Sequence, residues 1–173
     1  MSRLIRIAKG SLAVEFIWQQ DRYAQRVLWL GDGDERVLLE SIEGTADTDW
    51  PISPPLQHVH VEERPGDVVV ALAVGMAGRS HWSMSVELDP KLNRLAFDVA
   101  CRCHQQPERL GSTYRQSSDA WRVVLHDDAR LEETLRIVPI AAVEKLPATV
   151  RWRYAVEESG KRKAESGTGG KEV

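Results

Sequence analysis

The feature that most constrains the fold is a regular alternation of apolar and polar residues between positions 79 and 104. Apolar side chains occupy every second position over residues 82–88 and again over residues 95–103. This period of two is typical of a strand with one buried and one solvated face, and Asp89-Pro90 between the runs favours a turn. We therefore predict an antiparallel β-hairpin in which Leu88 pairs with Leu95. Its apolar side has to be covered by a second layer.

The same register predicts what lies on the polar face of the hairpin. Ser85 falls opposite Asp98 and His81 falls opposite Arg102, with Glu87 on the same side. A serine, a histidine and a carboxylate on one face raise the hypothesis of a hydrolase. Serine catalysis also needs a sharp nucleophile turn and a backbone oxyanion nest, and neither pattern is present. The face is predicted to be either solvated cross-strand pairs or a small-ligand site, and the sequence favours a protein that is not an enzyme.

Alternating runs recur along most of the 173 residues and are separated by turn formers, such as GDGD at 31–34. About ten short strands with little helix predict an all-β fold, an antiparallel β-sandwich of two sheets. We expect a single domain over residues 1–156, followed by a flexible polar tail over residues 157–173.

Two segments carry more specific expectations. The continuous apolar run at 67–78, DVVVALAVGMAG, predicts a central strand covered on both faces. Residues 127–138 are predicted to form a short helical turn followed by a strand. Leu131, Leu135 and Val138 align on one side of a helix, which Pro139 would then end.

Trp50 lies in the one long irregular connection, residues 44–55, which is rich in turn formers and proline. The other five tryptophans alternate with apolar residues and are predicted to pack in the core. Two fates are open for Trp50. It either forms an exposed platform on which a ligand stacks, or it folds down over the end of the core.

Metal binding is suggested by the segment LQHVHVEE, where His58, His60 and Glu62 occupy alternate positions. On a strand the three project from one face at about 6.6 Å intervals, a spacing that lets imidazoles and a carboxylate meet a divalent transition metal. The pair resembles the His-x-His of cupin-type barrels. The cupin glutamate and second motif are not found at the expected places, so a solvated strand face is the alternative.

Charge and cysteine content exclude several classes. With 23 Lys and Arg against 26 Asp and Glu, the net charge is −3 and no dense basic block exists, so we expect no nucleic-acid partner. No apolar run approaches the ~20 residues of a membrane helix, and the N-terminal residues do not resemble a signal peptide. We therefore expect no membrane association and a cytoplasmic protein. Cys101 and Cys103, two apart on one strand, cannot bridge each other and are predicted to be small buried apolar residues.

Three classes of function follow from these patterns. The first is a non-enzymatic ligand-binding module, with carbohydrate as the candidate ligand, using the residues Trp50, His81, Glu87, Asp98 and Arg102. The second is a metal-binding β protein or metalloenzyme that uses His58, His60 and Glu62. The third is a protein-interaction or assembly domain, such as a homo-oligomer joined through its sheet edges.

Overall fold

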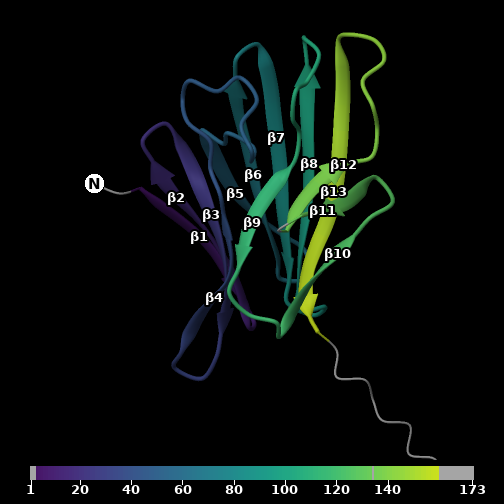
Figure 1. The fold of residues 1–173 in the computed structure, drawn as a ribbon. Helices are drawn as coiled ribbons and strands as arrows, with labels where there is room; N and C mark the ends of the chain where they lie inside the picture. Colours follow the sequence, from purple (N-terminus) through teal and green to yellow (C-terminus); the bar gives the residue numbers. More distant parts are fainter. Residues whose placement is uncertain (1–2, 134, 160–173) are drawn as a thin grey trace, which may run out of the picture.

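The computed structural model describes residues 3–133 and 135–159, and it confirms the all-β sandwich (Figure 1). Two antiparallel sheets are packed together, and the described residues include no helix. The strands are β1 (Leu4–Lys9), β2 (Leu12–Gln19), β3 (Arg22–Leu30), β4 (Glu35–Ser41), β5 (His58–Arg64), β6 (Val68–Ala77), β7 (Ser80–Asp89), β8 (Arg94–Cys103), β9 (Ser112–Gln116), β10 (Trp121–Leu125), β11 (Ala129–Glu132), β12 (Arg136–Pro139) and β13 (Ala148–Glu158).

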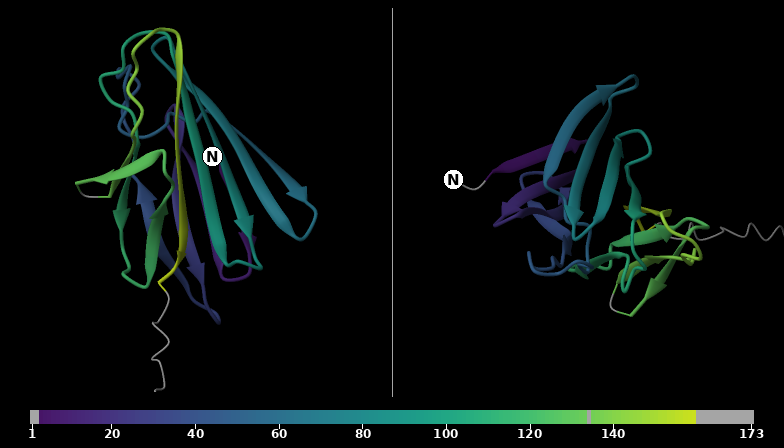
Figure 2. Two further views of the ribbon diagram at one scale, coloured as in Figure 1. Left: turned by 90° about the vertical axis from the view of Figure 1, so that its right-hand side faces the viewer. Right: turned by 90° about the horizontal axis from the view of Figure 1, so that it is seen from above.

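The strand order assigns almost the whole N-terminal part to one sheet and the central hairpins to the other. The seven-stranded sheet runs β1-β2-β3-β4-β9-β12-β11, and the six-stranded sheet runs β10-β13-β8-β7-β6-β5. In the left view of Figure 2, β13 in yellow and the teal and blue strands β8 to β5 lie side by side in the second sheet. This sheet contains the predicted meander of β6, β7 and β8.

The predicted register of the central hairpin is confirmed. Leu88 pairs with Leu95, and the pairs that follow place His81 opposite Arg102 and Ser85 opposite Asp98. The inward residues are buried and the outward ones lie at the surface, so the alternation predicted both faces. Local periodicity is sufficient here because each residue of one strand constrains its partner on the other.

The core lies between the sheets and is held together by aromatic residues and a few hydrogen bonds that cross it. Trp152 Nε1 donates to Ser112 Oγ at 3.0 Å, and the hydroxyl oxygens of Tyr114 and Tyr154 lie 2.6 Å apart. Both bonds join β13 to β9 in the opposite sheet. They satisfy polar atoms that would otherwise be costly to bury.

Both cysteines are buried and free, as predicted. Burial raises the pKa of the Cys101 thiol far above its usual range. The thiolate form is therefore strongly disfavoured, and the pair behaves as small apolar residues in the core.

The predicted helical turn within residues 127–138 is wrong. Ala129–Glu132 and Arg136–Pro139 pair as the antiparallel strands β11 and β12. Leu131, which a helix would have buried, is 51% exposed, and Leu135 has a φ of 56°, which a right-handed helix does not contain. The chain has thirteen described strands where about ten were expected, because β1 and the short β9 and β11 did not alternate strongly enough to be predicted.

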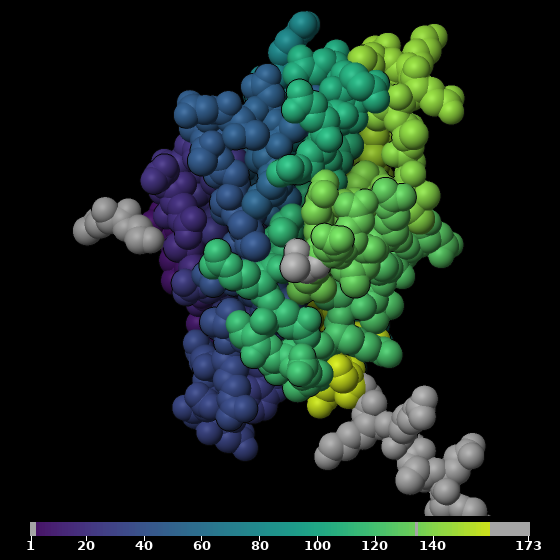
Figure 3. All heavy atoms as spheres, in the orientation of Figure 1, coloured from purple at the N-terminus to yellow at the C-terminus, as the bar shows by residue number. Residues whose placement is uncertain are grey.

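The long loop between β4 and β5, residues 42–57, is confirmed as irregular, and its C-terminal part packs inside the sandwich. In Figure 3 its blue atoms fill the surface beside the green strand β9. Ser53 Oγ accepts a hydrogen bond from the Thr113 amide at 3.0 Å, which fixes the loop to β9. A Cβ built on Gly75 would lie 1.7 Å from the Pro55 carbonyl oxygen, so the loop also lies directly against β6.

This contact decides which side chains of β6 face inward. Ala71, Ala73 and Gly75 point into the sandwich and the larger residues point outward, and at Gly75 the loop leaves no space for a side chain. The prediction of a strand covered on both faces is therefore confirmed for residues 69–71 and wrong from Leu72 to Met76. The outward residues Leu72, Val74 and Met76 are among the exposed large apolar side chains of the described chain.

The remaining expectations concern the ends of the chain and the membrane. Glu157 and Glu158, assigned to the tail by the sequence, belong to β13, and residues 160–173 lie outside the described residues. Across 3–133 and 135–159 there is no helix whose length and apolar character would suit a membrane span.

Candidate functional site

The candidate site is the outward side of β5, β6, β7, β8 and β13, which we call the outer face. Its centre is an apolar stripe along β6 formed by Leu72, Val74 and Met76, which are 38%, 50% and 47% exposed. Strand pairing sets His60 and Ser85 on either side of Leu72, and His58 and Ser83 on either side of Val74. Exposed apolar patches with polar residues at their rim are typical of ligand-binding grooves and interaction sites.

Two adjoining pockets hollow the outer face. One has a volume of about 420 Å³ and the other about 380 Å³, and they share Val74, Ser83 and Ala100. Ser83 and Ala100 pair across β7 and β8, and their small side chains form the floor. The two pockets therefore make one trough, with the apolar stripe on one side and β13 on the other. Its size is within the ordinary range of small-molecule sites.

One end of the trough is cationic and lacks a carboxylate. Arg102, His81 and His58 line the larger pocket, and among the described residues no Asp or Glu does. Arg102 Nη1 donates to Thr149 Oγ1 at 3.2 Å, its one side-chain hydrogen bond within the described chain. The His81 ring also lies edge-on to His104, with centroids 5.8 Å apart.

The neighbouring arginines of the outer face are already neutralised. Arg151 Nε donates to Asp98 Oδ1 at 2.7 Å, and its Nη2 donates to the other carboxylate oxygen. The hydrogen bond to Asp98 raises the pKa of Arg151. Arg153 is held by Asp128 at 2.6 Å. Arg102 therefore differs from both in having a guanidinium fork free to receive an anion.

The residues predicted for ligand binding are distributed unevenly over this surface. His81 and Arg102 line the larger pocket and Asp98 lines the smaller one, so the structure brings these three to one trough. Glu87 lies farther along β7, outside both pockets, with Arg64 Nη1 3.7 Å from its Oε2.

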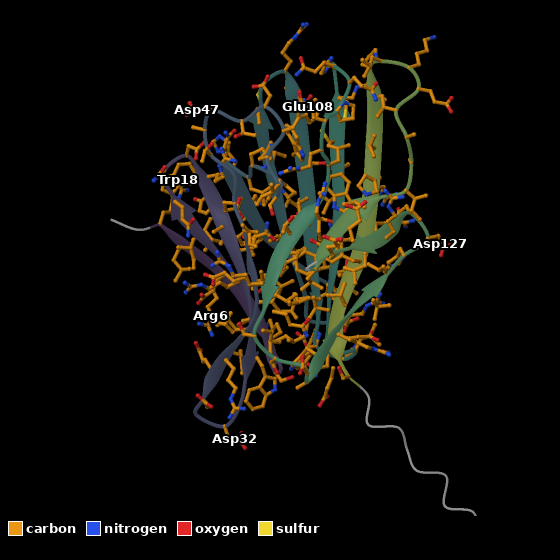
Figure 4. The ribbon with its side chains drawn as sticks, in the orientation of Figure 1. Arg6, Trp18, Asp32, Asp47, Glu108 and Asp127 are labelled. Atoms are coloured by element: carbon orange, nitrogen blue, oxygen red, sulfur yellow. The ribbon has the colours of Figure 1, made fainter. Side chains whose placement is uncertain are left out.

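Trp50 is not an exposed platform. It is 6% exposed and packs edge-on against Trp82, with ring centroids 5.8 Å apart. Figure 4 places Asp47 of the same loop at the outside of the molecule. Trp50 belongs to the buried core between the sheets. Burying the large indole outweighs leaving it at the surface, so of the two predicted fates the second is correct.

The metal hypothesis lacks a completed ligand set. His58, His60 and Glu62 do project from the outer face, as the alternation predicted, because they pair with outward residues of β6. Glu62 Oε1, however, accepts two hydrogen bonds from Arg64, at 2.8 and 3.0 Å. Across the part of the chain that the structure describes, no group of three or more His, Cys, Asp or Glu side chains is arranged to hold a metal ion.

The hydrolase hypothesis is not supported by the spacing along β7. His81 and Ser85 are four residues apart on one strand, about 13 Å, which is far beyond hydrogen-bond reach. Asp98, which would orient the histidine, is bound to Arg151. Ser85, His81 and Asp98 therefore do not form a nucleophile, base and acid triad.

The sequence prediction missed the apolar stripe and Thr149. A signal for the stripe was present, since residues 70–77 alternate large with small apolar side chains (VALAVGMA). Such an alternation indicates that one side of the strand has space and the other does not. Thr149 had no signal, because its contact with Arg102 depends on the pairing of β13 with β8.

Fold and site together define the class as an all-β sandwich with an open, amphipathic trough on one sheet. No family model matches the chain, and no curated protein or solved structure matches it.

Proposed function

We propose that this protein is a non-enzymatic binding module whose ligand lies in the trough of the outer face. The observation that carries the proposal is the exposed stripe of Leu72, Val74 and Met76 beside a floor of small residues. A monomeric surface gains nothing from exposing large aliphatic side chains in a row, whereas covering them with a ligand removes apolar area from water.

The chemistry of the walls favours an aliphatic ligand over a carbohydrate. Sugar sites commonly use an aromatic ring as a stacking platform, and the exposed large apolar residues of the described chain are all aliphatic. Trp50, the platform candidate from the sequence, lies in the core. Carbohydrate binding is therefore the second outcome that the test should distinguish.

Methyl NMR titration of the full chain with a mixed library of aliphatic acids, alcohols and oligosaccharides tests the proposal. Binders are expected to shift the methyl signals of Leu72, Val74 and Met76. Val74→Gln is expected to lower their affinity. The control is Leu92→Gln, which changes an exposed aliphatic residue at the β7–β8 turn, outside the trough. Hits that shift other methyls, or that lose affinity equally in both variants, would overturn the proposal.

A further inference from the structure

We infer that the ligand of the trough is an amphipathic organic acid, whose anionic head binds at Arg102 and whose aliphatic body lies along the apolar stripe. This inference rests on the proposed binding function and adds the chemical class of the ligand. It follows from the asymmetry of the trough, which is cationic at one end and apolar along one side.

Among the residues that the structure describes, no carboxylate pairs with the charge at the Arg102 end. Of the three arginines on the outward side of β8 and β13 in this region, Arg151 is bound to Asp98 and Arg153 to Asp128. Arg102 donates to a neutral hydroxyl, that of Thr149. A guanidinium forms its strongest hydrogen bonds with a planar carboxylate or a phosphate, which offers two oxygens to the fork.

The groups around Arg102 also favour an anion. Across β7 it faces His81, across β13 it faces Thr149, and on β8 its outward neighbours are Ala100 and His104. The nearest carboxylate on the same strand, Asp98, is four residues away, about 13 Å, and is occupied by Arg151. Hydrogen-bonding side chains therefore flank Arg102 on β7 and β13, and no described carboxylate in the pocket lining repels a negative head group.

The apolar stripe supplies the second half of the argument. From Leu72 to Met76 it extends about 13 Å along β6, and Met76 pairs with His81 next to Arg102. An acyl chain bound at Arg102 by its head can therefore lie over Val74 and reach Leu72. The Ser83 and Ala100 floor leaves the depth that such a chain needs.

The test compares three ligands of equal chain length: octanoate, 1-octanol and octylammonium. Their affinities for the full chain are measured by calorimetry at low salt, with methyl NMR to locate binding. Octanoate is expected to bind about tenfold tighter than octanol, because the charged hydrogen bond adds to the same apolar contact. Octylammonium is expected to bind more weakly than octanol, because its charge meets Arg102.

Two variants assign the preference to Arg102. Arg102→Gln should bring octanoate to the affinity of octanol and leave octanol unchanged, and Arg102→Lys should retain part of the preference. Arg153→Gln is the matched control, since it removes an equal charge from the same face outside both pockets, and its partner Asp128 also lies outside them, so the preference for octanoate should stay intact. Amide spectra of each variant check that its fold is unchanged.

The outcomes separate this inference from the proposed function. If octanol and octanoate shift the stripe methyls with equal affinity, or if Arg102→Gln has no effect, the organic-acid class is wrong and the binding trough stands. If an oligosaccharide or another library member binds the trough and none of the octyl compounds does, the organic-acid class is also wrong and the binding trough still stands. If nothing in the library shifts these methyls, both are wrong.

Discussion

The outward sides of the two sheets differ in charge pairing and in apolar exposure. On the seven-stranded sheet, strand pairing sets charges of alternating sign in one row from β1 to β9: Arg6, Glu15, Arg26, Glu40 and Arg115. Arg6 bonds Glu15 at 3.1 Å and Arg26 bonds Glu40 at 3.1 Å. The outer face of the six-stranded sheet instead has an exposed apolar stripe and Arg102, which no carboxylate of the described chain neutralises.

Apolar exposure differs in the same direction. Ala13, Ala24 and Leu28 point outward in the middle of the seven-stranded sheet and are at most 6% exposed, whereas the stripe residues on β6 are 38–50% exposed. Leu4, on the edge strand β1, is 53% exposed and is an exception on the seven-stranded sheet. Opposite charges on neighbouring strands stabilise a sheet without any partner. The outward side of the seven-stranded sheet therefore pairs its charges internally, whereas the outer face keeps apolar area exposed, which is the feature on which the proposed ligand site rests.

The largest expected effect is on stability, and it tests why the large side chains of β6 point outward. Gly75→Ala places a methyl group against the backbone of Pro55, which cannot move without displacing the loop. We expect it to lower the free energy of unfolding by about 3 kcal/mol, measured by urea denaturation. Ser83→Thr, which adds a methyl on the outward side of β7, should change stability by less than ~0.5 kcal/mol. Equal stability of the two variants would mean that the loop does not direct the large residues outward.

The second effect uses pH to separate an interior carboxyl from the paired surface carboxylates. Burial raises the pKa of Glu43 from 4.5 to about 7, while a hydrogen bond from Arg6 lowers the pKa of Glu35. Because the folded state holds the Glu43 proton more tightly, this stabilisation is full below about pH 4.5 and is lost as pH rises to about 7. The Glu35 contribution has the opposite sign and is lost at acid pH.

Glu43→Gln should therefore remove a fall in unfolding free energy of roughly 2–3 kcal/mol between pH 4.5 and pH 8. Denaturation curves at several pH values measure it. Glu63→Gln, at an exposed position on β5, is the control and should keep the wild-type pH dependence. A parallel pH dependence in both variants would show that Glu43 is ionised as readily as a surface carboxyl.

The smallest effect tests the charge comparison itself. Glu15→Gln leaves Arg6 and Arg26 without the carboxylate between them, and Glu15 is only 9% exposed, so we expect a loss of about 1 kcal/mol. Arg102→Gln should change stability by less than ~0.5 kcal/mol, because no carboxylate depends on it. Thermal or urea unfolding of the pair gives the answer. A larger loss for Arg102→Gln would contradict the view that its charge serves a ligand.

Part of the candidate site could be predicted because it depends on one hairpin. The turn at Asp89-Pro90 and the alternation on both sides placed His81 opposite Arg102 and Ser85 opposite Asp98, and the structure confirms both pairs. The alternation also placed His58, His60 and Glu62 on one face. It could not predict that Arg64 would donate hydrogen bonds to Glu62, because strand periodicity does not determine the rotamers of long exposed side chains.

The sequence by itself determined the all-β class, the buried cysteines and the two faces of the central hairpin, since all of these follow from a period of two along contiguous residues. Only the tertiary structure decided that β6 is open on its outward side, that Trp50 is buried and that Arg102 bonds Thr149 and no carboxylate of residues 3–133 and 135–159. Each of these depends on a distant segment: Pro55 against Gly75, Trp50 against Trp82, and Thr149 beside Arg102. Periodicity predicts which side chains share a face. Which distant segment packs against that face depends on the tertiary structure.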